Sequence, residues 1–296
     1  MRLRRWGLSI AVASVATLAL AGSAFAGPPT GIYSDFNHCP QSDPTVTSCL
    51  FSQVTSGSFQ LGTSTVPVSH TITLQGGVGS DPNTFQTFFV NAVGADSLSK
   101  TGLDVPGGLL AIVQASGLTG APLAAFEAAI HAVNDVTATA ELVGPVQINL
   151  LSFITGSGSS LVLPVRIHLE NPFLGGGCYI GSSSSPVDLA MTTGTTAPPS
   201  RDTPITGGTG TTTFSSDGGI TYVTGFKLVN NSFLVPAASG CGYGPFVSMI
   251  TAAVNAKEGL PASAGTNSAT FNASQMLANK INVIASESAA GSTSQR

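Results

Sequence analysis

Charged residues are scarce in this chain. Asp, Glu, Lys and Arg make up only 8% of its 296 residues, whereas about 25% is usual for soluble domains. Uncharged polar residues and glycine must therefore supply most of the surface that meets water. Because the chain has only four lysines and more acidic than basic residues, it repels phosphate backbones, which argues against nucleic acid as a partner.

The common phosphate-binding and nucleophile motifs are also missing. Residues 171–185 read NPFLGGGCYIGSSSS, but their glycines lack the lysine that a phosphate-binding loop requires. Ile180 takes the place of the last glycine of the dinucleotide-binding fingerprint, and no GxSxG sequence occurs in the chain. The sequence therefore predicts no cofactor and no catalytic residue from a motif.

Long apolar runs are missing except near the start of the chain. Basic residues there precede an apolar run over about residues 8–20, and the AFA sequence at 24–26 matches the small-x-small pattern of signal peptidase sites. Because about 20 apolar residues are needed to span a bilayer, the run predicts a signal peptide over 1–26 rather than a retained anchor. Cleavage is expected between Ala26 and Gly27, after export by the general secretory or the twin-arginine route.

The predicted mature chain, residues 27–296, is expected to be a single secreted β-rich domain without a transmembrane anchor. Removal of the leader takes away three arginines and leaves seven basic residues against 14 acidic ones. We expect an acidic extracellular protein. Its partners stay open, with contact to the cell envelope or to an apolar small molecule as the two alternatives.

The chain holds four cysteines, an even number that favours two disulfides in an exported protein. Four cysteines allow three pairings, and spacing does not strictly choose among them. Two of them are close in sequence with prolines between them. The other two share a glycine-rich setting, which lets two backbones approach closely. The predicted bridges are Cys39–Cys49 and Cys178–Cys241.

The segment around the first two cysteines offers an alternative to a disulfide. Asp35 and His38 stand close to Cys39, and together with Cys49 they include the nitrogen and sulfur ligands that zinc prefers. Their spacing matches no standard zinc site, and an exported chain generally oxidises its thiols. We therefore predict a disulfide here and no metal.

Alternation of apolar and polar residues predicts a mainly β fold. The clearest strand is residues 161–170, in which Val165, Ile167 and Leu169 face one way and the polar residues between them face the other. Pro67 and Pro164 predict sheet edges or bulges. Further strands are expected over residues 66–74, 85–93, 136–151, 186–193 and 219–229.

Helical spacing of apolar residues predicts two helices, over residues 121–135 and 244–259, and a short third one over 107–115. The fold class is therefore α+β by content: an antiparallel sheet or β-sandwich with two to three packed helices on one side or end. The apolar face of the 244–259 helix is expected to contain Phe246, Met249, Ile250, Ala253 and Val254.

Four histidines are the remaining candidates for chemistry. His168 lies on the polar face of its strand beside Arg166 and Glu170, so a carboxylate–histidine pair is one interpretation and ordinary solvent-facing polarity is the other. A solvent-facing position predicts that His168→Ala changes stability by no more than about 0.5 kcal/mol. His131 is expected to form a surface pair with Glu127 on its helix. His38 is considered above with the cysteines, and His70 has no partner at ligand spacing.

Part of the chain resembles a known group of proteins. Asn171-Pro172, Cys178-Tyr179-Ile180-Gly181, a TTGTT-PP segment and Gly240-Cys241-Gly242 resemble uncharacterised secreted proteins of high-GC Gram-positive bacteria. The resemblance covers roughly the C-terminal half of the chain. It implies secretion and a shared fold, and it brings no activity or site residues with it.

These observations favour an exported non-catalytic protein of the cell surface or the extracellular medium, with a structural or binding role. One alternative is an exported hydrolase whose site forms only in the fold, with His168 and Glu170 as candidates. Another is a carrier of an apolar ligand, suggested by apolar helix faces beside a β-sheet. A pocket with a histidine or carboxylate beside a nucleophile would favour the enzyme, and a dry apolar cavity would favour the carrier.

Overall fold

The computed structural model describes residues 27–84, 86–109, 119–130, 133–199 and 202–293. The predicted signal peptide, most of the expected helix at 107–115, and His131 lie outside these residues. Within the described ranges, no helix combines the length and the apolar character that a membrane span needs.

The strands form two antiparallel sheets, A and B. In spatial order, sheet A contains β11 (Thr211–Phe214), β12 (Ile220–Asn230), β14 (Ser268–Asn279), β1 (Val46–Leu61), β3 (Ile72–Ser80) and β4 (Thr87–Asn91), with β2 (Ser64–Pro67) also paired to β1. Sheet B contains β13 (Ala238–Ser239), β9 (Tyr179–Ile180), β8 (Leu161–Glu170), β6 (Thr137–Leu142) and β5 (Gly102–Asp104), with β7 (Gln147–Ile148) and β10 (Val187–Met191) also paired to β8.

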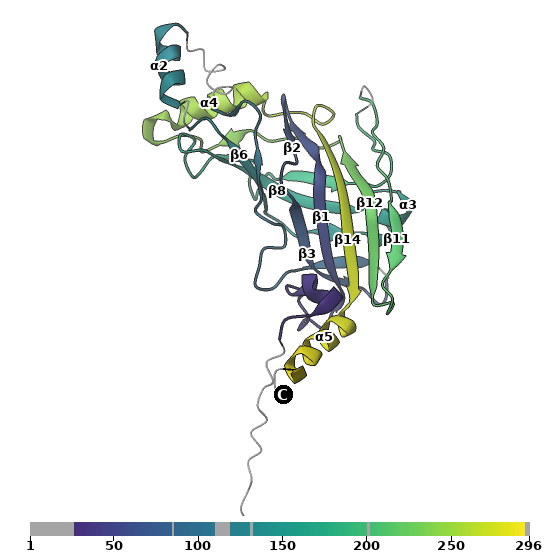
Figure 1. Ribbon diagram of the computed structural model, residues 1–296. Helices are drawn as coiled ribbons and strands as arrows, with labels where there is room; N and C mark the ends of the chain where they lie inside the picture. Colours follow the sequence, from purple (N-terminus) through teal and green to yellow (C-terminus); the bar gives the residue numbers. More distant parts are fainter. Residues whose placement is uncertain (1–26, 85, 110–118, 131–132, 200–201, 294–296) are drawn as a thin grey trace, which may run out of the picture.

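The main apolar core lies between the two sheets. Sheet A contributes Leu50 and Phe226 to it, and sheet B contributes Val165 and Ile167. Figure 1 shows the strands of sheet B running across behind those of sheet A. This arrangement confirms the predicted β-rich α+β fold with antiparallel sheets.

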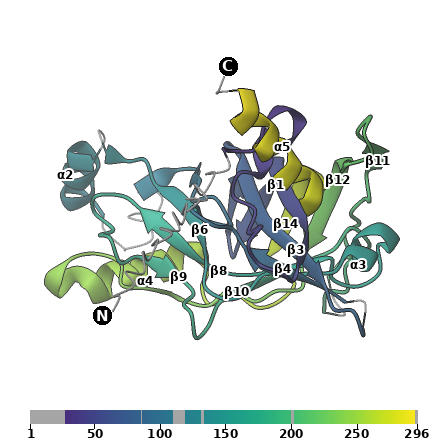
Figure 2. The same cartoon turned by 90° about the horizontal axis from the view of Figure 1, so that it is seen from below.

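Helices occupy the two ends of the molecule. Figure 1 shows α2 (Ala121–Ile130) and α4 (Val247–Glu258) at one end, and α5 (Lys280–Thr293) at the other, beside the C-terminus. The 3₁₀ helix η1 (Gly31–Phe36) and α5 lie side by side over one end of the outer face of sheet A (Figure 2), where Phe36, Ile220 and Val283 form a second, smaller core. The described residues also form α3 (Leu150–Thr155) and the 3₁₀ helix η3 (Gly244–Phe246).

Both predicted long helices are present, but the buried part of the apolar face of α4 is narrower than predicted. Ala253 and Val254 are buried, whereas Phe246 and Met249 are 59% and 57% exposed. Helical spacing marks a stripe of apolar residues, but it does not say how much of that stripe meets the protein. The end of α4 matches the prediction, because Gly259 adopts a left-handed φ of 64° and its N–H donates to the Asn255 carbonyl.

The predicted strands are confirmed in part. β8 has the predicted bounds and burial alternation, and β4, β10 and β12 fall within or close to their predicted ranges. The prediction of one strand over 66–74 is wrong, because β2 ends at Pro67 and β3 begins only at Ile72. The predicted strand at 136–151 is also divided, because a turn containing Gly144 and Pro145 separates β6 from β7, and α3 follows.

Pro164 lies inside β8 and shows how a central strand tolerates proline. The N and C=O of one residue in a strand point to the same neighbour, and the Pro164 carbonyl accepts a hydrogen bond from Val143 N–H at 3.0 Å. Val143 lies between β6 and β7, at the point where β8 changes partner on that side. The missing proline N–H therefore falls at an interruption of the ladder, as the prediction of a bulge or edge requires.

The glycines around Cys178 allow close backbone approach at a disulfide. The sulfur atoms of Cys39 and Cys49 are bonded, as are those of Cys178 and Cys241, which is the predicted pairing. The Cα atoms of the second pair lie only 4.0 Å apart. A Cβ atom on Gly240, whose φ is +69°, would collide with the Gly177 carbonyl. Gly240 therefore makes room for the bridge, and Gly175, with a φ of +71°, lies against the Gly242 carbonyl. A Cβ atom on Gly176 would meet nothing and one on Gly177 would make only ordinary contact, so the bridge does not require all three glycines of the GGG sequence.

We predict that the two bridges contribute unequally to stability. On the chain-entropy model, Cys178→Ser with Cys241→Ser costs about 4 kcal/mol, and Cys39→Ser with Cys49→Ser costs about 3 kcal/mol, because the first pair closes the longer loop. Guanidinium denaturation of both double variants tests the order. Non-reducing peptide mapping tests the pairing, and a peptide linking Cys39 to Cys178 would contradict it.

Glu258 is a buried carboxyl at the end of α4. Its backbone carbonyl accepts a hydrogen bond from Thr63 N–H at 3.0 Å, which ties α4 to the turn between β1 and β2. Burial raises the pKa of the Glu258 carboxyl, and a hydrogen bond with the Ser64 side chain opposes this only partly. Compared with the unfolded chain, the folded protein therefore shifts the equilibrium of the Glu258 carboxyl towards its protonated form.

We predict that Glu258→Gln stabilises the protein at neutral pH. Between the ordinary pKa of glutamate and the higher pKa of Glu258 in the fold, the native state binds more protons than the unfolded state. The contribution of Glu258 therefore falls as pH rises through that window. Glutamine keeps the shape of the side chain and removes its charge. The gain in the free energy of unfolding should therefore appear at pH values above this window and vanish at pH values below it. Urea denaturation from pH 4 to pH 8 measures this, and a gain of equal size at every pH would contradict the assignment.

Candidate functional site

A cluster of charged and aromatic side chains lies on the outer face of sheet B. Val165, Ile167 and Leu169 of β8 point into the core, so Arg166, His168 and Glu170 face outward. Register places Glu141 of β6 opposite Arg166, and Tyr179 of β9 opposite His168. We call Glu141, Arg166, His168, Glu170 and Tyr179 the outer-face cluster.

Arg166 is held on two sides within this cluster. Its Nη2 lies 2.7 Å from Glu141 Oε2, and its Nε donates to the same oxygen at 2.9 Å. The guanidinium carbon lies 4.0 Å from the centre of the Tyr179 ring. The Glu141 side chain is 17% exposed, so water screens this ion pair less than a surface pair.

His168 is more covered than a solvent-facing residue would be. Its Nδ1 lies 3.1 Å from Glu170 Oε1 and 4.0 Å from Glu141 Oε1, and its ring stacks on Tyr179 with 4.4 Å between centroids. Only 16% of the side chain is exposed. Nε2 is buried and has no hydrogen-bond partner in the described chain.

This geometry resembles only half of a catalytic arrangement. In a hydrolase of the Ser-His-Asp kind, one imidazole nitrogen is held by a carboxylate and the other faces a nucleophile and the substrate. Glu170 supplies the first contact, but the buried Nε2 of His168 faces no hydroxyl or thiol within hydrogen-bond distance. The arrangement in this structure holds the cluster together rather than presenting a base.

The other candidates from the sequence are dispersed. Cys39 and Cys49 are used by their disulfide, so they are not available to the zinc site considered with Asp35 and His38. His38 Nδ1 lies 3.0 Å from the Val93 carbonyl oxygen, and Nδ1 of the exposed His70 lies 3.1 Å from the Ser69 hydroxyl. Within the described ranges, no group of three or more His, Cys, Asp or Glu side chains could hold a metal ion.

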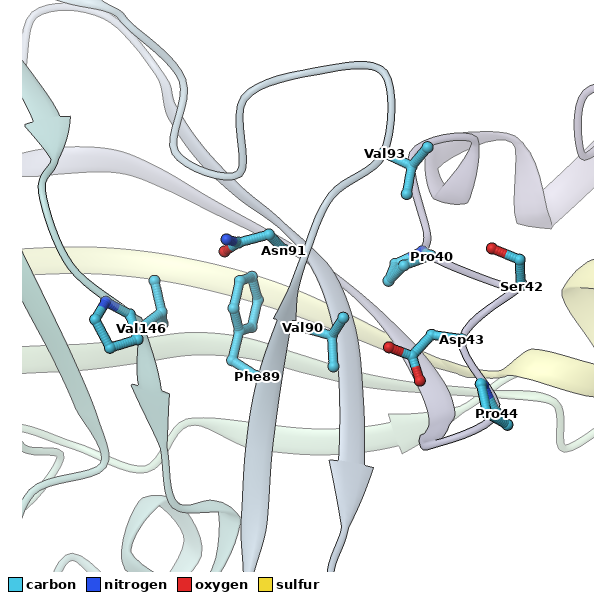
Figure 3. A pocket seen from close by; sticks show the side chains of 10 residues that line it. Pro40, Ser42, Asp43, Pro44, Phe89, Val90, Asn91, Val93 and Val146 are labelled. Atoms are coloured by element: carbon cyan, nitrogen blue, oxygen red, sulfur yellow. The ribbon is translucent and has the colours of Figure 1, made fainter.

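A trough with a volume of about 660 Å³ runs along β4. Figure 3 shows Phe89 and Val90 of β4 between Val146 on one side and residues 40–44 on the other. Its lining is mostly apolar. The full lining is Pro40, Ser42, Asp43, Pro44, Phe89, Val90, Asn91, Val93, Pro145 and Val146.

A second, polar cavity of about 520 Å³ shares Asn91 with this trough. Glu141 and Arg166 line it, so the outer-face cluster borders it directly. The exposed pair Lys100 and Asp96, with 3.3 Å between Nζ and Oδ2, also belongs to its lining. The two cavities therefore adjoin where the edge of sheet A meets the β6–β7 turn of sheet B. Sequence reasoning did not find either cavity, because three or more separate segments build each of them.

No known protein family, curated protein or solved structure shows significant similarity to this chain.

We predict that His168→Ala destabilises the protein by about 1–2 kcal/mol, because it removes a largely buried ring that stacks on Tyr179 and lies 3.1 Å from the Glu170 carboxylate. This is more than the sequence-based expectation of about 0.5 kcal/mol or less. His168→Phe should cost less than His168→Ala, because phenylalanine keeps the stack on Tyr179 and removes the unpartnered nitrogen. Urea denaturation measures both variants. Lys100→Ala, which breaks an exposed pair, is the control with little expected effect. Equal stability of wild type and His168→Ala would show that the ring contributes nothing.

Proposed function

We propose that this chain is an exported, non-catalytic protein of the cell surface or its surroundings, and that it acts by binding. The observation that carries the proposal is the state of the cysteines: all four are joined in two disulfides. Such bonds persist in oxidising compartments outside the cytoplasm, which fits the leader sequence of residues 1–26. The resemblance to secreted proteins of high-GC Gram-positive bacteria supports the same assignment.

The hydrolase alternative has less support. It needs His168 to accept a proton from a nucleophile or water, and the nitrogen available for this is buried without a partner. The polar cavity beside the cluster contains Ser97, but its hydroxyl already donates to Asn91 Oδ1 and accepts from Ala92 N–H. Among the described residues, no histidine lines that cavity.

The carrier alternative needs an enclosed apolar cavity. Large side chains fill the space between the sheets, among them Phe153 and Phe226, whose rings meet edge to face at 4.8 Å. The trough along β4, whose lining is mostly apolar, lies at a sheet edge. That position suits a ligand that lies along the surface better than one enclosed within the protein.

We predict that the protein recovered from culture medium begins at Gly27, because signal peptidase cuts after small residues at the AFA sequence. N-terminal sequencing of the secreted protein measures this. Ala26→Leu should leave the leader attached, since it puts a bulky residue at the cleavage position, and Ala26→Ser is the matched control that keeps a small residue. Wild-type protein that retains its leader, or that stays in the cytoplasm with reduced cysteines, would contradict export.

A further inference from the structure

We propose that the trough along β4 binds one extended, uncharged polypeptide segment, which adds a strand to the edge of sheet A. The proposal rests on the binding role given above and names the class of ligand. Three features of the trough carry it: the free edge of β4, the two walls beside that edge, and the nearly uncharged lining.

The first feature is the free edge. β4 is the last strand of sheet A, and among the described residues it pairs with β3 alone. Its start is covered by β7, where the Thr87 hydroxyl donates to the Ile148 carbonyl at 3.1 Å. Beyond its end, Val93 N–H donates to the His38 carbonyl at 2.9 Å. Residues 88–91 lie between these contacts, and they offer about 13 Å of strand edge on which alternate residues direct N–H and C=O outward.

The second feature decides between a peptide and a second folded copy. Residues 40–44 and the Pro145–Val146 turn stand on either side of β4 (Figure 3). A strand pairs at about 4.8 Å from its neighbour, so a sheet edge of another folded molecule would have to bring its own flanking elements between these walls. A single extended segment needs no such space. The trough therefore fits main-chain pairing by a free segment, which is a common mode of peptide recognition.

The third feature defines the side chains of the ligand. Proline, valine and phenylalanine provide most of the lining, and Asp43 is its one charged residue. An oxygen of that carboxylate already accepts hydrogen bonds from Thr45 N–H at 2.8 Å and from the Thr45 hydroxyl at 2.6 Å. An acidic side chain on the ligand would be repelled by this carboxylate, and away from Asp43 a charged side chain of either sign would lose water without gaining a charged partner. Small apolar and uncharged polar side chains fit best.

The opposite edge of sheet A provides a matched control. β11 is also an edge strand, but all four of its residues are exposed, and it lines neither the trough nor the polar cavity. Phe214 on β11 is 69% exposed, and Val93 at the trough is 57% exposed. Lysine at either position should leave the fold intact, which equal melting temperatures would confirm. Only lysine at Val93 places a charge in the trough.

The test uses the oxidised protein purified from medium and a phage-displayed library of random nonapeptides. We expect enrichment of peptides without charged residues. Fluorescence anisotropy then measures the affinity of the best synthetic peptide and of the same peptide with alternate backbone nitrogens methylated. Val93→Lys should weaken binding by about tenfold or more, through the cost of desolvating an unpaired charge, while Phe214→Lys leaves it unchanged. Methylation should abolish binding, because it removes the main-chain donors that pair with β4.

Hydrogen exchange locates the contact: the peptide should slow amide exchange in residues 86–93 and not in β11.

No enrichment of peptides over the Val93→Lys protein, or equal affinity of the methylated and unmethylated peptides, would overturn the proposal. Concentration-dependent dimers with β4 protected in the absence of peptide would overturn it in favour of a second copy. Cleavage of the bound peptide would support the site and contradict the non-catalytic function. A protein that is exported but binds no peptide would overturn the ligand class alone.

Discussion

Scarcity of charge is the constraint on which the rest of this structure depends. With ten basic and 14 acidic residues in 296, the chain satisfies most of its buried polar groups through the backbone and through uncharged side chains. Asn267 shows how this is done. It is buried, and its amide nitrogen donates to the carbonyls of Phe233 and Ser263, while its amide oxygen accepts from Gly62 N–H. One neutral side chain thereby joins three segments without the desolvation cost of an ion.

Against this background, the outer-face cluster is exceptional. It gathers Arg166, His168 and two glutamates on one face of sheet B and covers part of their charge with Tyr179. Arg166 and Glu141 form an ion pair at 2.7 Å, and such pairing is the condition for tolerating partial burial. The cluster also forms the border of the polar cavity. We infer that the contacts within the cluster fix β6, β8 and β9 relative to one another beside the trough.

The sequence predicted those parts of the fold whose two faces differ in environment. β8 alternates because one face meets the core and the other carries the outer-face cluster. The sequence of β1 does not alternate in this way, so it did not predict this strand, which lies between β14 and β3 in sheet A. Its inner face meets the main core, and η1 and α5 cover part of its outer face, so buried and exposed positions do not alternate along it. Cys178–Cys241 was predictable because glycine next to cysteine indicates close backbone approach, and Cys39–Cys49 because the two cysteines are close in sequence with prolines between them.

The site was less predictable, for a physical reason that concerns edges. His168 and Glu170 are visible in one strand, but Glu141 and Tyr179 reach them only through sheet register. The trough depends on a strand that lacks a neighbour, and no residue of β4 carries that information. Natural sheets usually protect such an edge with charge, proline or a bulge to prevent association. Here β4 has none of these within its TFFVN sequence, and the protection comes from prolines on the neighbouring loops. Residues 40–44 and the Pro145–Val146 turn keep a second sheet away from β4, but they leave a space one strand wide. The same geometry therefore protects the edge against self-association and selects an extended ligand.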